Sequence, residues 1–577
     1  MKALRSVVAA LAVAVGVGAA PLVAPEAPVA DAAQQGDLEQ IRALIKSGAD
    51  VNAPQGDGMT ALHWAAQNGD AGMAELLLYA GANPGATTRL GAYTPLHLAS
   101  ASGRVEVTRA LIRAGARVQA ATATGATPLH LAADAGSAEL VGALIEGGAL
   151  VNATESYALR TPLMFAAARN RVEAVRALLA GGADANLTTR VVDYAERASN
   201  DQKDQEERER RVAAARGEPA EQPPQGRGGG GGGGGQQPPP DQGTARPLNY
   251  DDLVGKQGGL AAIHYAARDG YAETVMALLD AGVDVNLLTA GDRSTPLLVA
   301  VINGNFDMAR TLVERGGDPN AASEDGVAPL FAAINTQWNL RTWYPQPTAY
   351  QQQETSYLEL MEGLLGAGAD PNARLTQHLW YSAYNAGRMG VDYMGATAFW
   401  RAAYATDVEA MKLLVAYGAD PHIPTMKPPG GGGRRGGDDG DEDPSGLPPV
   451  PAGGPGVYPI HAATGVGFGT SRVGQQHRSV PDGWLPAVKY LVDELGADVN
   501  VRDHEGFSAV HHAAARGDNE VILFLVEHGA DVTGVSRRGQ TTVDMANGPQ
   551  QRVQPFPETI ALLESLGAKN NNKCLSC

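Results

Sequence analysis

The sequence predicts an all-α solenoid built from about twelve repeated helical pairs. Four related tetrapeptides, beginning at Thr60, Thr94, Thr127 and Thr161, follow one another at steps of 34, 33 and 34 residues. A fixed period of this length is the signature of stacked repeats. Hydrophobic residues make up 44% of the 577 residues and aromatic residues only 5%, so the core must consist of thin layers of Ala, Leu and Val. Many of the 72 Gly and 36 Pro recur at the same place in each repeat, as is typical of turns between short helices.

Each recurring position has a physical reason. In a segment such as Thr94-Pro95-Leu96, Thr caps the first helix, Pro occupies its first turn without losing a hydrogen bond, and Leu faces the core. The Ala pair that follows lets consecutive helices approach closely, and Gly ends helices by adopting positive φ. The pattern resembles the ankyrin consensus, which joins Thr-Pro-Leu-His, an Ala pair and a Gly-Ala-Asp tail. Further copies begin at Ala262, Thr295, Ala328, Thr397, Tyr458, Ser508 and Thr541.

A histidine recurs at the fourth position of many of these segments: His63, His97, His130, His264, His461 and His511. Several such residues in a row suggest a catalytic or metal-binding line. In ankyrin repeats, however, this His hydrogen-bonds backbone between repeats, so the resemblance implies a structural role.

Residues 1–30 are interpreted as a signal peptide and short leader of bacterial type. Lys2 and Arg5 supply a positive start, and the apolar stretch from Val7 to Ala20 has signal-peptide length and is short for a membrane span. We expect cleavage between about Ala20 and Ala30, and a periplasmic or secreted chain without a transmembrane segment. The alternative is an uncleaved membrane anchor.

The remaining chain is divided by composition. The predicted segments are an N-terminal repeat block (31–189), a charged and then Gly/Pro/Gln-rich disordered insertion (190–257), a second repeat block (258–426), a Gly/Pro/Asp-rich linker (427–456), a C-terminal repeat block with its cap (457–568) and a tail (569–577). The alternative for the charged half of the first insertion is a solvated helix.

The second repeat block carries two aromatic-rich insertions, 337–353 and 374–394, in a chain otherwise poor in aromatic residues. Trp and Tyr dominate binding hot spots, and loops on a rigid scaffold often carry function. We therefore predict a partner-binding surface at Trp338, Trp343, Tyr344, Trp380, Tyr381 and Tyr384, with Arg388 as a polar anchor. The alternative is that these rings pack the loops onto the solenoid. Trp400, inside a repeat helix, is interpreted as structural.

The chain ends in Cys574-Leu575-Ser576-Cys577. In an exported protein this pair suits a local disulfide, thiol exchange or half of a metal site. It also resembles the start of a C-x-x-C-H haem motif, but no His follows. A redox, haem- or metal-associated periplasmic protein is therefore the alternative function.

The net charge and the catalytic motifs that the sequence lacks argue against several classes of function. Lys and Arg total 45 against 63 Asp and Glu, a net charge of −18, which argues against nucleic acid as a partner. Calcium at Asp438, Asp439, Asp441 and Asp443 is less favoured than a surface loop, because a bidentate Glu at the right spacing is not evident. The sequence contains neither G-x-S-x-G nor H-E-x-x-H. We therefore predict a monomeric, non-catalytic protein-interaction scaffold with an unidentified protein partner and neither cofactor nor metal.

Overall fold

The structure, a computed structural model, describes residues 26–216, 250–340, 346–379, 391–429, 443–468, 477–548 and 554–573. The chain divides into two compact units. The first unit comprises Met1–Tyr157 and Thr161–Ala183, and the second comprises Ala158–Arg160 and Asp184–Cys577.

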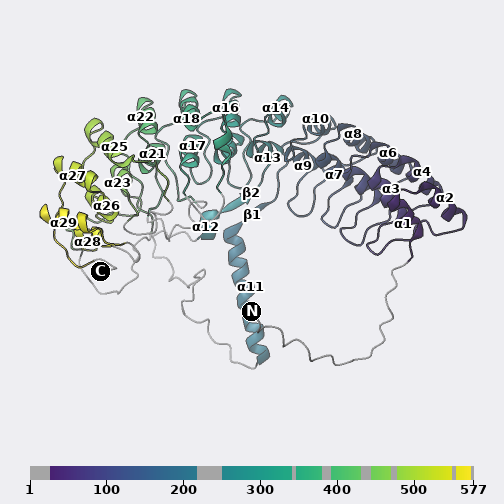
Figure 1. Cartoon of the computed structure of the whole chain (residues 1–577), viewed down its shortest axis with the longest axis horizontal. Coiled ribbons are helices and arrows are strands. Elements are labelled where there is room, and N and C mark those ends of the chain that lie inside the picture. The colour runs from purple at the N-terminus through teal and green to yellow at the C-terminus, as the bar shows by residue number, and fades with distance from the viewer. Residues whose placement is uncertain are drawn as a thin grey trace, which may run out of the picture. The chain divides into compact units, whose positions relative to one another are not determined.

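The first unit is a stack of helical pairs (Figure 1). The pairs are α1 (Pro28–Gln35) with α2 (Leu38–Lys46), α3 (Ala61–Asn68) with α4 (Ala71–Tyr79), α5 (Pro95–Ala101) with α6 (Val105–Arg113), α7 (Pro128–Ala135) with α8 (Ala138–Glu146), and α9 (Pro162–Ala167) with α10 (Val172–Ala180). First helices contact first helices of the next pair, and second helices contact second helices, so two helical layers run along the stack.

The second unit repeats this arrangement. Its pairs are α13 (Ala262–Arg268) with α14 (Ala272–Asp280), α15 (Pro296–Ile302) with α16 (Phe306–Glu314), α17 (Pro329–Gln337) with α18 (Tyr357–Gly366), α21 (Ala398–Tyr404) with α22 (Val408–Ala416), α23 (Pro459–Thr464) with α25 (Trp484–Lys489), α26 (Ala509–Arg516) with α27 (Asn519–Glu527), and α28 (Thr542–Ala546) with α29 (Pro557–Ser565). A π-helical turn, Tyr490–Glu494, extends α25. The described residues thus form twelve helical pairs, and the predicted all-α solenoid of about twelve repeats is confirmed.

The repeated histidine joins neighbouring repeats. The Thr94 N–H donates to Nδ1 of His97 at 3.0 Å, and His97 Nε2 lies 3.2 Å from the carbonyl oxygen of Ala126 in the next repeat. Because Nδ1 accepts, Nε2 carries the proton and donates. His63, His264, His461 and His511 make equivalent contacts with backbone carbonyl groups. The backbone role that the ankyrin resemblance implies for these five residues is confirmed.

The hairpin that joins the second helix of one repeat to the first helix of the next is called a finger. Short and long fingers are closed by the same pair of hydrogen bonds. Before α7, the Thr122 N–H donates to the Ala126 carbonyl (2.9 Å) and the Ala126 N–H donates to Thr122 Oγ1 (3.1 Å). The same bonds link Thr88 with Tyr93, Thr289 with Ser294, Thr189 with Leu260, and Thr425 with Val457. Since closure needs only the residues at the base, the tip tolerates long insertions, because the entropic cost of closing a loop grows slowly with its length. The insertions 190–257 and 427–456 both leave from such tips.

Both ends of the 190–257 insertion are folded in the structure. The strands β1 (Val191–Asp193) and β2 (Lys256–Gly258) pair antiparallel, and α11 (Tyr194–Arg216) and α12 (Tyr250–Val254) adjoin them. The charged half is the helix that the alternative proposed, and the disorder predicted for the Gly/Pro/Gln-rich half stays a prediction. Residues 217–249 lie outside the described residues.

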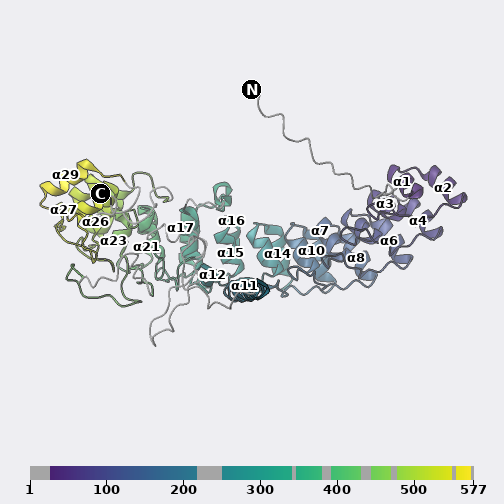
Figure 2. The same cartoon turned by 90° about the horizontal axis from the view of Figure 1, so that it is seen from below.

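The long helix α11 points away from the other helices of the second unit: Figure 1 shows it side-on and Figure 2 shows it end-on. None of its described side chains is buried. Pairs of opposite charge one turn apart support it, including Arg210 with Glu206 (3.7 Å) and Arg211 with Glu207 (2.5 Å). A polar helix of this kind is stabilised locally and needs no apolar contact face.

The last repeat is closed by the C-terminal tail. Asp544 stands where most repeats carry histidine, and its Oδ2 accepts the Thr541 N–H at 2.9 Å. Its Oδ1 accepts the N–H groups of Asn571 (3.2 Å) and Lys573 (3.3 Å), so the returning tail contacts this position in place of a further repeat. A terminal repeat with an altered outer face is what a solenoid cap requires.

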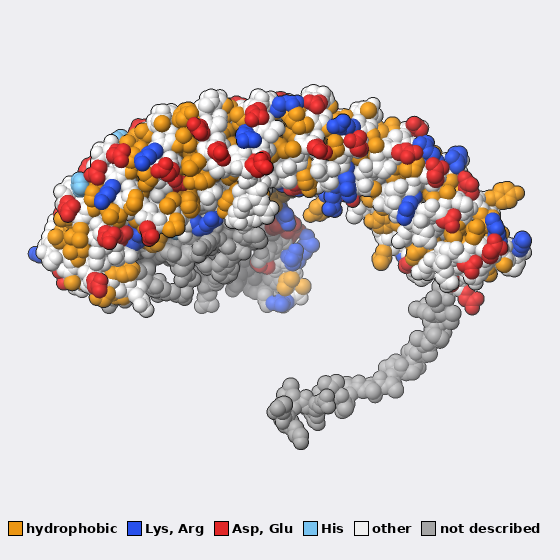
Figure 3. All heavy atoms as spheres, turned by 45° about the horizontal axis from the view of Figure 1, so that its top comes forward, with side chains coloured by type: hydrophobic (Ala, Val, Ile, Leu, Met, Phe, Trp, Pro, Cys, Tyr) orange, Lys and Arg blue, Asp and Glu red, His pale blue; other side chains and the backbone are white. Residues whose placement is uncertain are grey.

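Acidic and basic side chains are interspersed over the face that Figure 3 shows. Among the described helices, none is long and apolar enough to cross a membrane. Of the predicted signal peptide and leader, 1–30, residues 1–25 lie outside the described residues, and Pro28, Val29 and Ala30 belong to α1, so the repeat block begins before residue 31.

Candidate binding site

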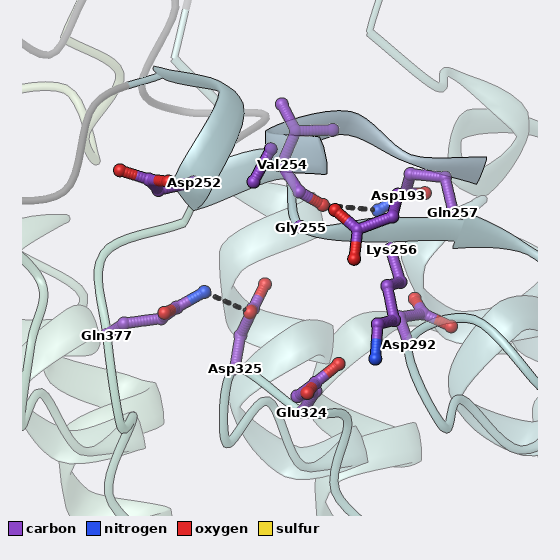
Figure 4. A pocket seen from close by; sticks show the side chains of 11 residues that line it. Asp193, Asp252, Val254, Gly255, Lys256, Gln257, Asp292, Glu324, Asp325 and Gln377 are labelled. Atoms are coloured by element: carbon purple, nitrogen blue, oxygen red, sulfur yellow. Dashed lines mark hydrogen bonds between the residues drawn. The ribbon is translucent and has the colours of Figure 1, made fainter. Parts of the chain in front are cut away.

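A pocket of about 270 Å³ lies on the finger side of the second unit (Figure 4). The two-stranded ribbon β1–β2 and the helix α12, both in the insertion 190–257, form one wall of the pocket. The fingers before α15, α17 and α21 form the other wall. Its lining residues are Asp193, Ala195, Asp252, Val254, Gly255, Lys256, Gln257, Asp292, Glu324, Asp325 and Gln377.

Glycine lets the ribbon lie directly on the neighbouring finger. The Ala290 N–H donates to the carbonyl of Gly259 at 2.9 Å. A Cβ atom at Gly291 would lie 2.6 Å from the Gly258 carbonyl oxygen, so no larger residue fits without a shift. The insertion is thus attached to the repeats at its base, and this attachment creates the pocket.

Asp325 is the most perturbed group in the pocket. Burial raises its pKa to about 6, and the neighbouring carboxylates of Asp292 and Glu324 add to the rise. A hydrogen bond from the Gln377 side-chain amide acts in the opposite direction. Asp292 is held by its own finger, since its carboxylate accepts the hydroxyls of Thr289 (2.6 Å) and Ser294 (2.8 Å).

The pocket is chemically one-sided. Five carboxylates line it, and the single basic lining residue is Lys256, whose side chain runs from β2 toward the wall with Asp292 and Glu324 (Figure 4). The lining contains neither histidine nor a hydroxyl or thiol nucleophile. No group of three or more potential ligands placed to hold a metal occurs among the described residues. Such a site can bind a cationic side chain by hydrogen bonds and charge.

Of the predicted aromatic site, the structure describes only Trp338. Its Nε1–H donates to Asp407 Oδ2 at 2.8 Å, and its ring meets Tyr357 edge-on with centroids 6.4 Å apart. The Tyr357 hydroxyl donates to the same oxygen at 2.7 Å, and the Asp407 side chain is buried. These contacts hold Trp338 against the repeats. Its part in partner binding stays a prediction.

The other predicted site residues lie outside the described residues: Trp343, Tyr344, Trp380, Tyr381, Tyr384, Arg388, Cys574 and Cys577. Their proposed roles in partner binding, and in redox or metal chemistry for the two cysteines, stay predictions.

A buried aromatic cluster lies beside Trp338. Trp400 is fully buried, stacks on Tyr404 with centroids 5.3 Å apart, and donates its Nε1–H to the Val457 carbonyl at 2.9 Å. This agrees with the structural role that its place in the helix predicts. Arg401, also fully buried, donates to Asn335 Oδ1 at 2.9 Å and to the Trp338 carbonyl. The cluster therefore ties α17 to α21.

Family models match the repeats on both sides of the insertion. Residues 29–122, 116–189 and 249–341 match ankyrin repeats (three copies), and residues 476–526 match ankyrin repeats (many copies). The chain is an ankyrin-repeat protein. The family match agrees with the helical pairs, the fingers and the histidine contacts of the structure.

Similar proteins share only part of this ankyrin-repeat chain. An ankyrin repeat-containing protein of Schizosaccharomyces pombe is 44% identical over 71 residues, which are 12% of this chain and 33% of that protein. Protein phosphatase 1 regulatory subunit 12A of Rattus norvegicus is 30% identical over 95 residues (16% and 8%), and palmitoyltransferase Hip14 of Drosophila melanogaster is 34% identical over 99 residues (17% and 16%). The matched stretches span a third or less of each of these proteins. All three are eukaryotic, so the bacterial type stays a prediction.

The acidic pocket was not predicted from the sequence. Its carboxylates lie on two different fingers and on the insertion, and their proximity depends on the β1–β2 pairing of residues 63 to 67 positions apart, Val191 with Gly258 among them. The available signal was weak: acidic residues next to Gly recur at the finger tips, as in Glu324-Asp325-Gly326.

Proposed function

We propose that this ankyrin-repeat protein is an exported, non-catalytic scaffold that binds a protein partner through the finger side of its second unit. The observation that carries the proposal is the acidic pocket, which the inserted ribbon forms together with the fingers before α15, α17 and α21. A solenoid that only needed stability would gain nothing from a polar cavity at its finger tips.

The lining indicates what part of a partner the pocket accepts. With five carboxylates and two amides against one lysine, a Lys or Arg side chain of the partner is the complementary group. The predicted aromatic residues of the insertion 374–394 would add apolar contacts, since Gln377 of that insertion lines the pocket. The insertion 337–353 joins α17 to α18 at the helix ends away from the fingers, where Trp338 contacts Asp407. A regulatory subunit among the similar proteins supports a role in protein interaction.

Export is part of the proposal and rests on Lys2, Arg5 and the apolar stretch Val7–Ala20. We expect the mature chain in the periplasm or outside the cell, beginning between about Ala20 and Ala30. Mass spectrometry of the N-terminus tests this, and an intact Met1 on cytoplasmic protein would refute it.

A capture experiment with matched variants tests the binding surface. The mature chain is compared with Asp325→Asn, which removes one pocket charge, and with Glu75→Gln, which removes an exposed carboxylate of the first unit. We expect the wild type and Glu75→Gln to retain the same partner, and Asp325→Asn to bind it at least several-fold more weakly. Equal binding by all three chains would show that the pocket is not part of the binding surface.

A further inference from the structure

The finger tips before α26 and α28 are covered by another part of the chain. Residues 443–450, which we call the strap, belong to the insertion that leaves the finger before α23. The strap crosses to Arg537, which stands at the tip of the finger before α28. Asp443 of the strap and Arg537 are 94 positions apart in the sequence.

Arg537 holds the strap through its guanidinium group. One nitrogen, Nη1, lies 2.5 Å from Asp443 Oδ2 and donates to the Leu447 carbonyl at 3.3 Å, while Nη2 donates to the Pro448 carbonyl at 2.6 Å. The third nitrogen, Nε, donates to the His504 carbonyl at 3.0 Å. The side chain is thus oriented from behind by the finger before α26 and presents its outer donors to the strap. A guanidinium suits this role because its donors are fixed in one plane.

Two finger glycines let the strap approach. A Cβ atom at Gly539 would lie 3.3 Å from Pro444 Cγ, and one at Gly506 would lie 3.4 Å from Leu447 Cδ1. Both glycines have positive φ, 75° and 83°. The finger tips therefore accept a segment that turns at Pro444–Ser445 and places a proline and a leucine beside these two glycines.

The strap is held by polar contacts and not by burial. No strap residue is buried, and the side chains of Asp443 and Arg537 are 38% and 20% exposed. At its far end, the Val450 carbonyl accepts the Lys427 ammonium at 2.6 Å. A segment held in this way can exchange with a competitor, because removing it uncovers little apolar surface.

We propose that the finger tips before α26 and α28 are a docking site for an acidic, proline-containing peptide of a partner protein, and that the strap occupies this site within the chain. The recognised feature is a carboxylate on Arg537 followed by backbone carbonyl groups that accept the same guanidinium. The proposal rests on the proposed function in assigning binding to the finger side. It concerns a different surface and the opposite charge, so each can fail alone.

A peptide with the strap sequence, Asp-Pro-Ser-Gly-Leu-Pro-Pro-Val, provides the test. Its binding is measured by fluorescence anisotropy to the full chain and to a variant with residues 443–450 replaced by a glycine–serine linker of the same length. We expect saturable binding to the linker variant and at least tenfold weaker binding to the wild type, since a tethered competitor acts at about millimolar effective concentration. Absence of binding to a folded linker variant at millimolar peptide would overturn the proposal.

Two substitutions locate the contact. In the linker variant, Arg537→Ala should abolish binding, and Arg113→Ala, an exposed arginine of the first unit, should leave it unchanged. A peptide with Asn in place of Asp443 should bind at least fivefold more weakly. If Arg537→Ala unfolds the last repeats, Arg537→Lys keeps the charge without the planar fork and should still weaken binding several-fold. Unchanged affinity with Arg537→Lys and with the Asn peptide would overturn the assignment to Arg537.

Discussion

Replacing Trp338 by Phe removes one hydrogen bond and keeps an aromatic ring. The Trp338 Nε1–H donates at 2.8 Å to Asp407, which is 2% exposed. A hydrogen bond to a charged group contributes about 1.5–3 kcal/mol to stability. Asp407 keeps the Tyr357 hydroxyl (2.7 Å) and the Ala410 N–H (3.0 Å), so its carboxylate is not left unpaired. We therefore expect the free energy of unfolding to fall by an amount near the lower limit, about 1.5 kcal/mol.

Urea unfolding followed by circular dichroism measures this loss, and hydrogen exchange in α17 and α22 locates it, since a repeat array need not unfold in one step. The matched control is Trp64→Phe, because the Trp64 Nε1–H donates at the same 2.8 Å to the half-buried, neutral side chain of Gln55. The control should lose only about 0.5–1 kcal/mol. If Trp338→Phe leaves stability and exchange unchanged but weakens partner binding, Trp338 belongs to the binding surface and the packing argument is wrong.

Three further predictions follow from the same contacts. Trp343→Ala or Trp380→Ala should cost about 2 kcal/mol or more in partner affinity and much less in thermal stability; the reverse order, measured on the same two variants, would identify the rings as loop packing. Burial lowers the pKa of His264 to about 4 and that of His511 to about 3, so only the unfolded chain takes up their protons as the pH falls below about 6.5. Each histidine should therefore lower the free energy of unfolding by about 1.4 kcal/mol for every pH unit that the pH falls between 6.5 and the pKa of that histidine in the folded chain. A free energy of unfolding that stays constant from pH 7 to 4.5 would contradict this. Asp325 has the opposite effect: its raised pKa of about 6 makes its charged form a cost to the fold, absent at low pH and complete above pH 6. Asp325→Asn should therefore raise the unfolding free energy at pH 8 by about 1–2 kcal/mol. If the substitution raised it no more at pH 8 than at pH 5, the pKa argument would be refuted.

Local patterns explain which parts of the fold were predictable. The cap of most first helices involves residues three positions apart, as in Thr94 with His97, so the same tetrapeptide forms the same turn wherever it occurs. The stacked Ala and Leu layers follow from the same period, because each repeat buries its apolar face only against its neighbour. The helix in the charged half of the insertion rests on pairs one turn apart, such as Arg210 with Glu206.

The candidate sites depend on contacts between residues far apart in the chain. Trp338 was recognised as unusual, but its acceptor, Asp407, lies 69 positions away. The β1–β2 pairing that forms the acidic pocket joins the two ends of an insertion whose composition predicted disorder. Closing such long loops costs entropy that no local pattern offsets, so propensity alone cannot show that they close.

The sequence by itself determined the repeat, its helical pairs, its histidine-capped turns and the positions of the insertions. It did so because these features depend on residues within one repeat period. The tertiary structure alone decided that Trp338 is tied to Asp407, that five carboxylates share one pocket, and that Arg537 holds the strap through Asp443. Stacking brings these residues together because it places the same position of successive repeats side by side. Which charges then meet depends on how each insertion folds back over the tips.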